Sequence, residues 1–450
     1  MNRSASRSRR EGTRQRTQFT PVWFEMAALL LIAGLIVGER AILALAASIL
    51  TVIPVAWWWK RVSLKGVEYQ RRLDKQRAFP GEHVDMTIHI TNRKLLPVSW
   101  LEISDEIPMA LPLVDGALMP THIPRVGALR QVVSLRWYER LSRHYRLACT
   151  ERGTYNLGRL HLTSGDLFTL FEEREERSED DRLIVFPRVW PVTDLGLPPK
   201  DPFGERTAPR RLIEDPLSTV GVRDHHPEDG MRRIHWKATA HKGDLQVRVY
   251  EPTATLELVV FLNVSTFEHH WQGVLPDLFE NAISVAASIA VWAVGARRKV
   301  GLVTNGCLVR SDQPARVPPG RSPDQLTRIL EMLAGVTSFA TGSIHKVLRR
   351  ESPGLPWGAT LVVVTPIVTA RLADVMDNLR HAGRRLALIS LEKDPPPQMR
   401  NIVTYHLPPS LPVFERGKDE GRASAEALRT SDLLRFDAYK PLVTPVGGEL

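Results

Sequence analysis

Residues 221–251 read GVRDHHPEDGMRRIHWKATAHKGDLQVRVYE, and the rest of the chain is organised around this stretch. It is the densest cluster of charged and histidine side chains in a chain made mostly of apolar strands and helices. Residues 245–250 alternate apolar with polar side chains, which predicts a half-buried strand. Ile234 and Trp236 need burial, whereas Arg233 and His235 do not. We therefore expect a folded segment with one buried and one exposed face.

This segment resembles the signature of the bacterial domain-of-unknown-function family fifty-eight. The family pattern has Gly-x-Arg-x-Tyr-x-Pro-Gly-Asp, then Arg-x-Ile-x-Trp-Lys-Ala-Ser/Thr-Ala-Arg, a Leu-x-Val strand and a Glu. The matching positions are Gly221, Arg223, Pro227, Asp229, Arg233, Ile234, Trp236, Lys237, Ala238, Thr239, Ala240, Leu245, Val247 and Glu251. The pattern departs at His225, Glu228 and His241, where the family has Tyr, Gly and Arg.

Length and composition predict several domains in a reducing or redox-indifferent setting. A chain of 450 residues with 43% hydrophobic content is long enough for two or three cores. Its two cysteines, Cys149 and Cys307, are too few for a disulfide framework. The net charge of +10 invites a nucleic-acid interpretation, but about half of it lies in the first twenty residues. The remainder is close to ordinary, so we expect no nucleic-acid partner.

Residues 1–21 are predicted to be a disordered basic arm in the cytoplasm. They hold six arginines and almost no apolar side chains before residue 19. The anionic inner leaflet is the natural partner of such an arm, because each basic residue near that surface contributes about 1 kcal/mol. A twin-arginine export signal at Arg9 and Arg10 is the competing interpretation. The hydrophobic run begins about ten residues too late for it.

Residues 22–59 are predicted to form a two-helix transmembrane hairpin. Its apolar runs, 22–38 and 41–59, are broken by Glu39 and Arg40, and each is just long enough to cross the hydrocarbon core at about 1.5 Å per residue. Trp23, Phe24 and residues 57–59 would form an interfacial belt. Basic residues before and after the hairpin place both termini in the cytoplasm, at the inner membrane. A cleaved signal peptide is the alternative.

Residues 62–187 carry the signals of short strands, and we expect an antiparallel β-sandwich-like domain there. Residues 84–91 alternate apolar with polar side chains after a Pro-Gly-Glu turn. Residues 166–171 read DLFTLF, where the related family usually has Asp-Pro-Phe-Gly-Leu-Phe. The missing Pro and Gly suggest a looser turn. The proline-rich region within 188–220 is predicted to be a linker.

Residues 252–412 alternate buried strands with helices, which predicts an α/β doubly wound parallel sheet. The helix over 277–298 is apolar enough to imitate a membrane span, but strands on both sides favour a buried crossover helix. This order resembles a von Willebrand factor A-type domain, whose metal site begins Asp-x-Ser-x-Ser after the first strand. Here Asn263 and Ser265 give a degenerate version, so we expect them to hydrogen-bond a loop rather than hold a cation. Residues 413–450 are predicted to be a charged tail.

Three functions compete for the signature. In an enzyme, a hydrolase or a metal-dependent one, Asp229 would act as base, a histidine as acid or ligand, and Arg232 or Arg233 as an anion clamp. An anion-binding or nucleic-acid patch is the second option, which the acidic residues nearly cancel. In the third, Asp229 pairs with Arg223 or Arg233 to fix a turn, Trp236 packs beneath it, and the exposed face binds a protein. A purely structural role for the same residues fits the sequence as well, and the sequence does not separate it from docking. The residues of that interaction site are Arg223, Pro227, Asp229, Arg233, His235, Trp236 and Lys237.

The sequence therefore predicts a membrane-anchored scaffold or adaptor rather than an enzyme, with no cofactor. The family resemblance implies a partner of the MoxR-type AAA+ ATPase class, because similar proteins work with such ATPases. The enzyme built on Asp229 remains the alternative.

Overall fold

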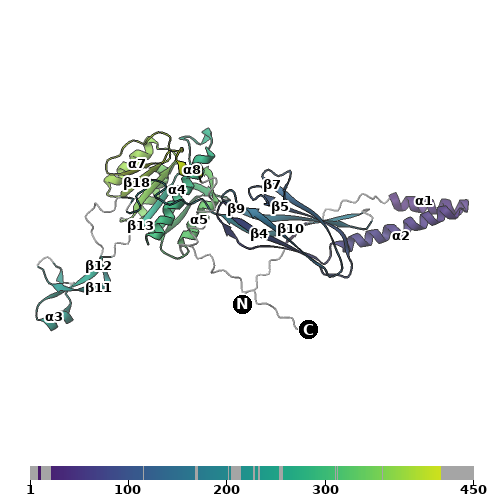
Figure 1. The fold of residues 1–450 in the computed structure, drawn as a ribbon, viewed down its shortest axis with the longest axis horizontal. Coiled ribbons are helices and arrows are strands. Elements are labelled where there is room, and N and C mark those ends of the chain that lie inside the picture. The colour runs from purple at the N-terminus through teal and green to yellow at the C-terminus, as the bar shows by residue number, and fades with distance from the viewer. Residues whose placement is uncertain are drawn as a thin grey trace. The chain divides into compact units, whose positions relative to one another are not determined.

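The computed structural model describes residues 9–11, 22–114, 116–167, 171–200, 202–203, 214–226, 229–231, 234–252, 257–309, 311, 313–356 and 358–416. These residues divide between two compact units, and the chain passes from the first to the second between Arg188 and Val189 (Figure 1). Most of the predicted basic arm and nearly all of the predicted tail lie outside the described residues; only β1 (Arg9–Glu11) and residues 413–416 fall inside.

The first unit begins with two apolar helices, α1 (Val22–Val37) and α2 (Arg40–Ser63). They are joined by Gly38, whose φ of 74° is a conformation that favours glycine. The predicted break at Glu39 is confirmed. α2 is long and apolar enough to cross a membrane, and only 17% of its most apolar window is buried. Many large apolar side chains of the pair face outward, which fits association with a membrane.

The rest of the first unit is an all-β domain of two sheets around one core. The strands are β2 (Val67–Leu73), β3 (Arg77–Ala78), β4 (His83–Asn92), β5 (Val98–Pro108), β6 (Met119–Pro120), β7 (Val126–Leu135), β8 (Arg140–Ala148), β9 (Gly153–Gly165) and β10 (Glu172–Val185). One sheet has the order β2-β4-β8, and the other runs β10-β9-β5-β7-β6. Alternating side chains of both sheets, such as Ile88 and Ile103, share one core. The structure confirms the predicted β domain. Its assignment as a β-sandwich stays a prediction.

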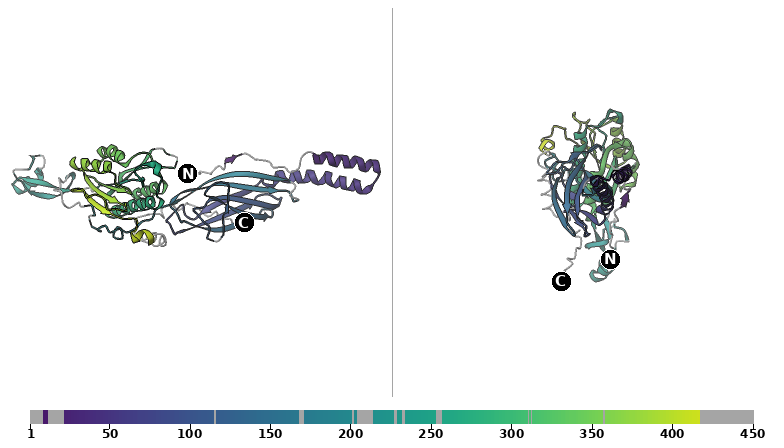
Figure 2. Two further views of the ribbon diagram at one scale, coloured as in Figure 1. Left: turned by 90° about the horizontal axis from the view of Figure 1, so that it is seen from above. Right: turned by 90° about the vertical axis from the view of Figure 1, so that its right-hand side faces the viewer.

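The second unit contains a mostly parallel sheet with helices on both faces (Figure 2). Its strands are β13 (Glu257–Leu262), β14 (Lys299–Leu308), β15 (Pro314–Gly320), β16 (Val336–Ala340), β17 (Thr360–Thr365), β18 (Arg385–Ser390) and β19 (Val403–His406). The order is β15-β14-β13-β17-β18-β19. β15 pairs with β14 in antiparallel fashion, as does β16, which lies off this path, and the other neighbours are parallel. Strand order therefore reverses between β13 and β17, which defines the switch point of a doubly wound sheet.

The helices of this α/β domain are α4 (Pro276–Gly295), α5 (Gln325–Gly335), α6 (Ile344–Glu351), α7 (Ala370–His381) and α8 (Pro412–Arg416), with short turns η3 (His270–Gln272) and η4 (Ser352–Gly354). α4 passes the same length and composition test as α2, but 61% of its window is buried. It is a core helix that packs on β13, β14 and β17, as the sequence predicts.

The first part of the predicted linker packs on the α/β domain. Trp190 is buried against Phe414, and its backbone N–H donates to the Ser288 hydroxyl at 2.8 Å. Phe203 meets Trp292 edge-on. Residues 204–213 lie outside the described residues.

The signature segment forms a small module of its own. β11 (Glu214–Asp224) and β12 (Gln246–Pro252) pair in antiparallel fashion, and α3 (Trp236–Lys242) lies between them in sequence. Ile234 bridges to Val247, and both side chains are buried. The strand expected over residues 245–250 is thus present from Gln246.

Candidate functional site

An ion pair holds the turn of the signature module. The two guanidinium nitrogens Nη1 and Nη2 of Arg223 donate to the two carboxylate oxygens of Asp229 at 2.7 and 2.6 Å. The backbone N–H of His226 donates to the same carboxylate at 2.9 Å. This two-pronged geometry is the strong form of an arginine–carboxylate contact. Of the two partners expected for Asp229, Arg223 is the one found; Arg233 lies outside the described residues, as do Pro227, Glu228 and Arg232.

These contacts decide the protonation state of Asp229. The hydrogen bonds from Arg223 and from the His226 N–H lower the pKa of the carboxyl to about 2. At neutral pH the group is ionised, and both of its oxygens already accept hydrogen bonds. A general base works best with a pKa near the operating pH. Asp229 in this arrangement is a structural anion and a weak base.

The other polar residues of the module also serve its local structure. His235 is the N-cap of α3, and its Nδ1 accepts from the Ala238 N–H at 3.0 Å. Asp224 accepts from Lys242, which lowers the pKa of its carboxyl, and from the Gln246 side chain. Gln246 is buried while Leu245 is exposed, because the side-chain amide of Gln246 donates to the Asp224 carboxylate. The sequence pattern did not predict that inversion.

Apolar side chains of the module face solvent. Trp236 is 65% exposed, so the expectation that it packs beneath the turn is wrong; Ile234 takes the buried position instead. Met231, Val222 and Leu245 are exposed as well, and Lys237 extends beside Trp236 in the sequence with its side chain in solvent. The module therefore combines paired charges with unpaired apolar surface.

A second polar cluster lies at the switch point of the parallel sheet, where such folds usually bind ligands. The Asn263 side chain follows β13 and donates to the Thr365 hydroxyl of β17 at 2.9 Å. Its oxygen accepts from the Asn305 side chain at 2.9 Å and from the Ser265 N–H at 3.1 Å. Asn305 in turn donates to the Gly342 carbonyl and accepts from the Val264 N–H. Asn263 and Ser265 thus hydrogen-bond the loops at this edge, as expected.

The amide and hydroxyl groups of this cluster are better suited to hydrogen-bonding one another than to binding a cation. A hard divalent ion prefers anionic oxygens, and the cluster offers amides and hydroxyls already engaged with one another. Among the described residues, no group of three or more His, Cys, Asp or Glu side chains is placed to hold a metal ion.

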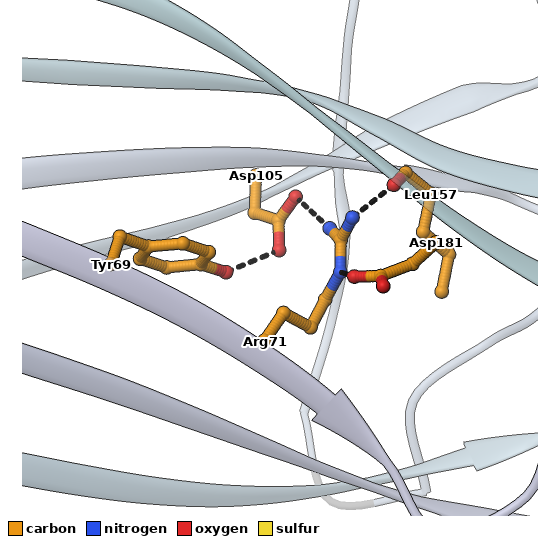
Figure 3. A network of polar contacts seen from close by, with 5 residues as sticks. All are labelled: Tyr69, Arg71, Asp105, Leu157 and Asp181. Atoms are coloured by element: carbon orange, nitrogen blue, oxygen red, sulfur yellow. Dashed lines mark hydrogen bonds and ion pairs between the residues drawn. The ribbon is translucent and has the colours of Figure 1, made fainter. Parts of the chain in front are cut away.

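The β domain contains a buried charged network that no sequence motif predicts (Figure 3). Arg71 of β2 reaches across the core to the other sheet, where it contacts Asp105 of β5 at 2.7 Å and Asp181 of β10 at 2.9 Å. It also donates to the Leu157 carbonyl, and the Tyr69 hydroxyl donates to Asp105 at 2.7 Å. Burial lowers the pKa of Arg71, but the surrounding oxygens outweigh it and raise the pKa above its usual range.

The fold and sites define a class of protein: an apolar helical hairpin carrying an all-β domain, followed by an α/β domain whose N-terminal side bears a small charged module. Residues 221–397 match the family model described as "Protein of unknown function DUF58". Over these residues, which make up less than half of the chain, the protein is similar to that family. The match starts at Gly221, the first residue of the signature.

A relative in Bacillus subtilis (strain 168), the uncharacterized protein YeaD, is 23% identical over 336 residues, which cover 74% of this chain and 77% of YeaD. The similarity therefore extends beyond the family region. Among solved structures, the CARDB domain of the PF1109 protein from Pyrococcus furiosus is 13% identical and covers 26% of this chain and 86% of that one, with a TM-score of 0.17. The C-terminal domain of Wzt is 12% identical and covers 27% and 73%, with a TM-score of 0.19. Scores this low carry no functional argument.

Proposed function

We propose that the protein is a membrane-anchored, cytoplasm-facing adaptor whose signature module binds a protein partner, with a MoxR-type AAA+ ATPase as the candidate. One observation carries the proposal: Arg223 is paired with Asp229 and Lys242 with Asp224, whereas Trp236 and Met231 stand in solvent. The Arg223–Asp229 pairing, which lowers the pKa of Asp229, favours this adaptor over an enzyme that uses Asp229 as a general base.

The exposed Trp236 side chain presents a large apolar surface to water, which a protein partner could bury. A large aromatic side chain buries much apolar area at a protein interface, and such residues dominate binding free energy there. The Arg223 fork keeps the neighbouring turn rigid, so less conformational entropy is lost on binding. Both features support a preformed docking surface.

The membrane side of the proposal rests on α2. Lys60 and Arg61 follow its apolar stretch, and the Arg61 guanidinium lies 3.8 Å from the centre of the Trp57 ring. Basic residues with tryptophan are typical of the cytoplasmic interface. We place both termini and both units in the cytoplasm, with α1 and α2 crossing the inner membrane. The finer fold, a von Willebrand factor A-like α/β domain, belongs to the same proposal, which the order of its strands and helices supports.

The test is a pull-down of the full-length protein in gentle detergent, with mass spectrometry of what co-purifies. Trp236→Ala combined with Met231→Ala removes the exposed apolar surface without touching the ion pair. Trp271→Ala is the matched control, because Trp271 is a similarly exposed tryptophan of the α/β domain, 70% exposed. We expect an ATPase to co-purify with the wild type and the control and to be lost with the double variant. Equal recovery from all three would contradict the docking surface.

The cytoplasmic placement has a separate test. Cys149 and Cys307 are buried, and burial raises the pKa of the Cys149 thiol to about 12, so neither native cysteine is a suitable label site. Val132→Cys places a thiol on the exposed face of β7. A membrane-impermeant maleimide should label it only after the cells are opened, and labelling of intact cells would overturn the topology.

A further inference from the structure

We infer that the end of the β domain nearest α2 rests on the membrane surface and binds anionic phospholipids. This inference rests on the proposed membrane anchoring of α1 and α2, and it adds a lipid-binding surface on the β domain. Two loops form that surface, residues 93–97 between β4 and β5 and residues 136–139 between β7 and β8. Both loops cross from one sheet to the other. We call them the end loops.

The first end loop is tied to the place where the chain leaves α2. β2 follows α2 after a short connection, and the backbone N–H of Arg93 donates to the Gly66 carbonyl in that connection at 2.8 Å. The ammonium group of Lys94 donates to the carbonyls of Val62 and Ser63 at the C-terminal end of the helix, where a cation is favoured. The helix end and the loop therefore lie side by side.

Hydrogen bonds hold the second end loop against the first. The Tyr138 N–H donates to the Lys94 carbonyl at 3.3 Å. The buried side-chain amide of Asn92 donates to the carbonyls of Leu96 and Arg136, one in each loop, at 3.0 and 2.8 Å. Tyr138 has a φ of 52°, which is uncommon for a residue other than glycine. Strain of this kind is retained at functional sites when the surrounding contacts fix it. The two loops thus form one preformed surface.

The position of this surface along α2 corresponds to the headgroup level of a bilayer. The apolar stretch of α2 reaches Trp59, and the helix ends at Ser63. At about 1.5 Å per residue, the helix end lies about 6 Å beyond that tryptophan. The headgroup region is about 5–7 Å thick on each side of the hydrocarbon core. Because residues 57–59 mark the edge of that core in the proposed anchoring, end loops fixed to the helix end lie among the headgroups.

The end loops present large apolar side chains to their surroundings. Leu95 is 74% exposed, Trp137 is 65% exposed and Tyr138 is 64% exposed. Tryptophan and tyrosine are enriched at the membrane–water interface, because each combines an apolar ring with a polar group. The headgroup region would cover the rings and the leucine and leave the hydroxyl and the indole N–H hydrated. These side chains therefore fit a membrane surface.

The charge around the end loops is complementary to an anionic surface. Seven lysines and arginines and one acidic residue, Glu139, lie in the segments that meet there, residues 60–66, 92–98 and 136–140. Arg93 pairs with Glu68 of β2 at 2.9 Å, and Arg136 and Arg140 are exposed. Arginine binds phosphate through its planar set of N–H donors, and anionic lipid attracts basic side chains close to its surface. The excess of positive charge therefore points to anionic phospholipid as the ligand.

The test measures the depth of the end loops in lipid nanodiscs. Because both native cysteines are buried, a single introduced cysteine can carry a fluorescent dye in the full-length protein. Leu95→Cys reports on the end loops, Leu50→Cys on the middle of α2, and Met109→Cys on the far end of β5; all three native side chains are exposed. The quenchers are phosphatidylcholines brominated either near the headgroup or near the end of the acyl chains.

We expect the shallow bromine to quench the dye at position 95 more strongly than the deep bromine, and the dye at position 50 to show the reverse order. Neither lipid should quench the dye at 109. Quenching at 50 without quenching at 95 would overturn the inference while leaving the membrane anchor intact. Absence of quenching at 50 would overturn the anchor, and the inference with it. A dye at 95 that is shielded from dissolved iodide but not quenched by brominated lipid would mean that protein covers the loops, and would also overturn the inference.

The preference for anionic lipid has its own test. Arg136→Gln combined with Arg140→Gln removes two positive charges from this surface. Arg125→Gln combined with Arg130→Gln is the matched control, because it removes two exposed arginines elsewhere on the β domain. We expect phosphatidylglycerol in the nanodisc to increase the shallow quenching at position 95 in the control and to have little effect in the first variant. Equal increases in both variants would overturn the assignment of these arginines to anionic headgroups.

Discussion

The two charged clusters of the molecule differ in where they lie and in how visible they are in the sequence. The Arg223–Asp229 pair stands on the surface of a small module, with the arginine side chain 43% exposed. The Arg71–Asp105 pair lies in the core between two sheets, with both side chains almost wholly removed from water. The first belongs to a recognisable family signature, and the second belongs to no motif.

The comparison shows that the most conspicuous sequence motif need not make the largest contribution to the free energy of unfolding. A buried ion pair loses its hydration on folding, so removing one partner leaves an uncompensated charge. A surface pair keeps much of its hydration and contributes little to global stability. We therefore expect the β domain to depend on Arg71 for folding, and the signature module to depend on Arg223 for its local shape.

Arg71→Met is the strongest way to probe this difference. It leaves Asp105 buried without its cation, and we expect a loss of about 3–5 kcal/mol in the free energy of unfolding. Pulse proteolysis in urea on the detergent-solubilised protein measures the loss.

The matched control is Arg71→Met combined with Asp105→Leu. Replacing both partners by apolar side chains removes the buried charge, so most of the lost stability should return. If the double variant were as unstable as the single one, packing by the arginine stem and not its charge would explain the effect.

Asp181→Asn should have a smaller effect in the same network. The Asp181 side chain is 34% exposed, and an asparagine oxygen can still accept from the Arg71 Nε. We expect a loss of no more than about 1 kcal/mol by the same urea assay. A loss as large as that of Arg71→Met would show that Asp181, and not Asp105, is the main counter-ion.

Much of the fold follows from the sequence because it depends on local patterns. The break at Glu39, the alternation in residues 84–91 and the apolar run of β13 can each be recognised within a few consecutive residues. The membrane-like α4 was placed correctly as a core helix because strands flank it on both sides. The packing of Trp190 and Phe203 on the α/β domain depends instead on tertiary contacts, with Phe414 and Trp292 respectively.

The site was only partly predictable for the same reason. The sequence offers Arg223 or Arg233 as the partner of Asp229, and the structure shows the pair with Arg223, six residues away, a separation that a single turn can close. The large apolar area of Trp236 predicts that this side chain is buried, yet the buried side chain of the module is Ile234. The partners of Arg71 lie 34 and 110 residues away in the chain, and no pattern within one strand indicates which carboxylates the other sheet will bring.

Asp229→Asn tests the surface half of the comparison. The asparagine has no negative charge and offers only one oxygen to the two guanidinium nitrogens of Arg223. The turn should therefore open locally, while the free energy of global unfolding in urea stays unchanged. Hydrogen exchange read by mass spectrometry should be faster in peptides covering residues 221–231 and unchanged in β4. Arg223→Lys is the companion variant, because a lysine keeps the charge but not the two-pronged geometry. A global loss of stability in either variant would remove the distinction between the two clusters.

Lowering the pH should have the smallest and most local effect on stability, because it protonates Asp229 and weakens only the turn of the signature module. The pKa of Asp229 is lowered to about 2 in the folded module, whereas an unperturbed aspartate titrates near 3.9. A lowered folded pKa stabilises the fold above the unfolded pKa, and that contribution is lost as pH falls from about 4 to about 2. After correction for intrinsic exchange rates, peptides covering residues 221–231 should lose protection across this range. The Asp229→Asn variant should already be open at pH 5 and respond less, with the remaining response coming from Asp224. An identical acid response in both proteins would mean that Asp229 does not hold the turn.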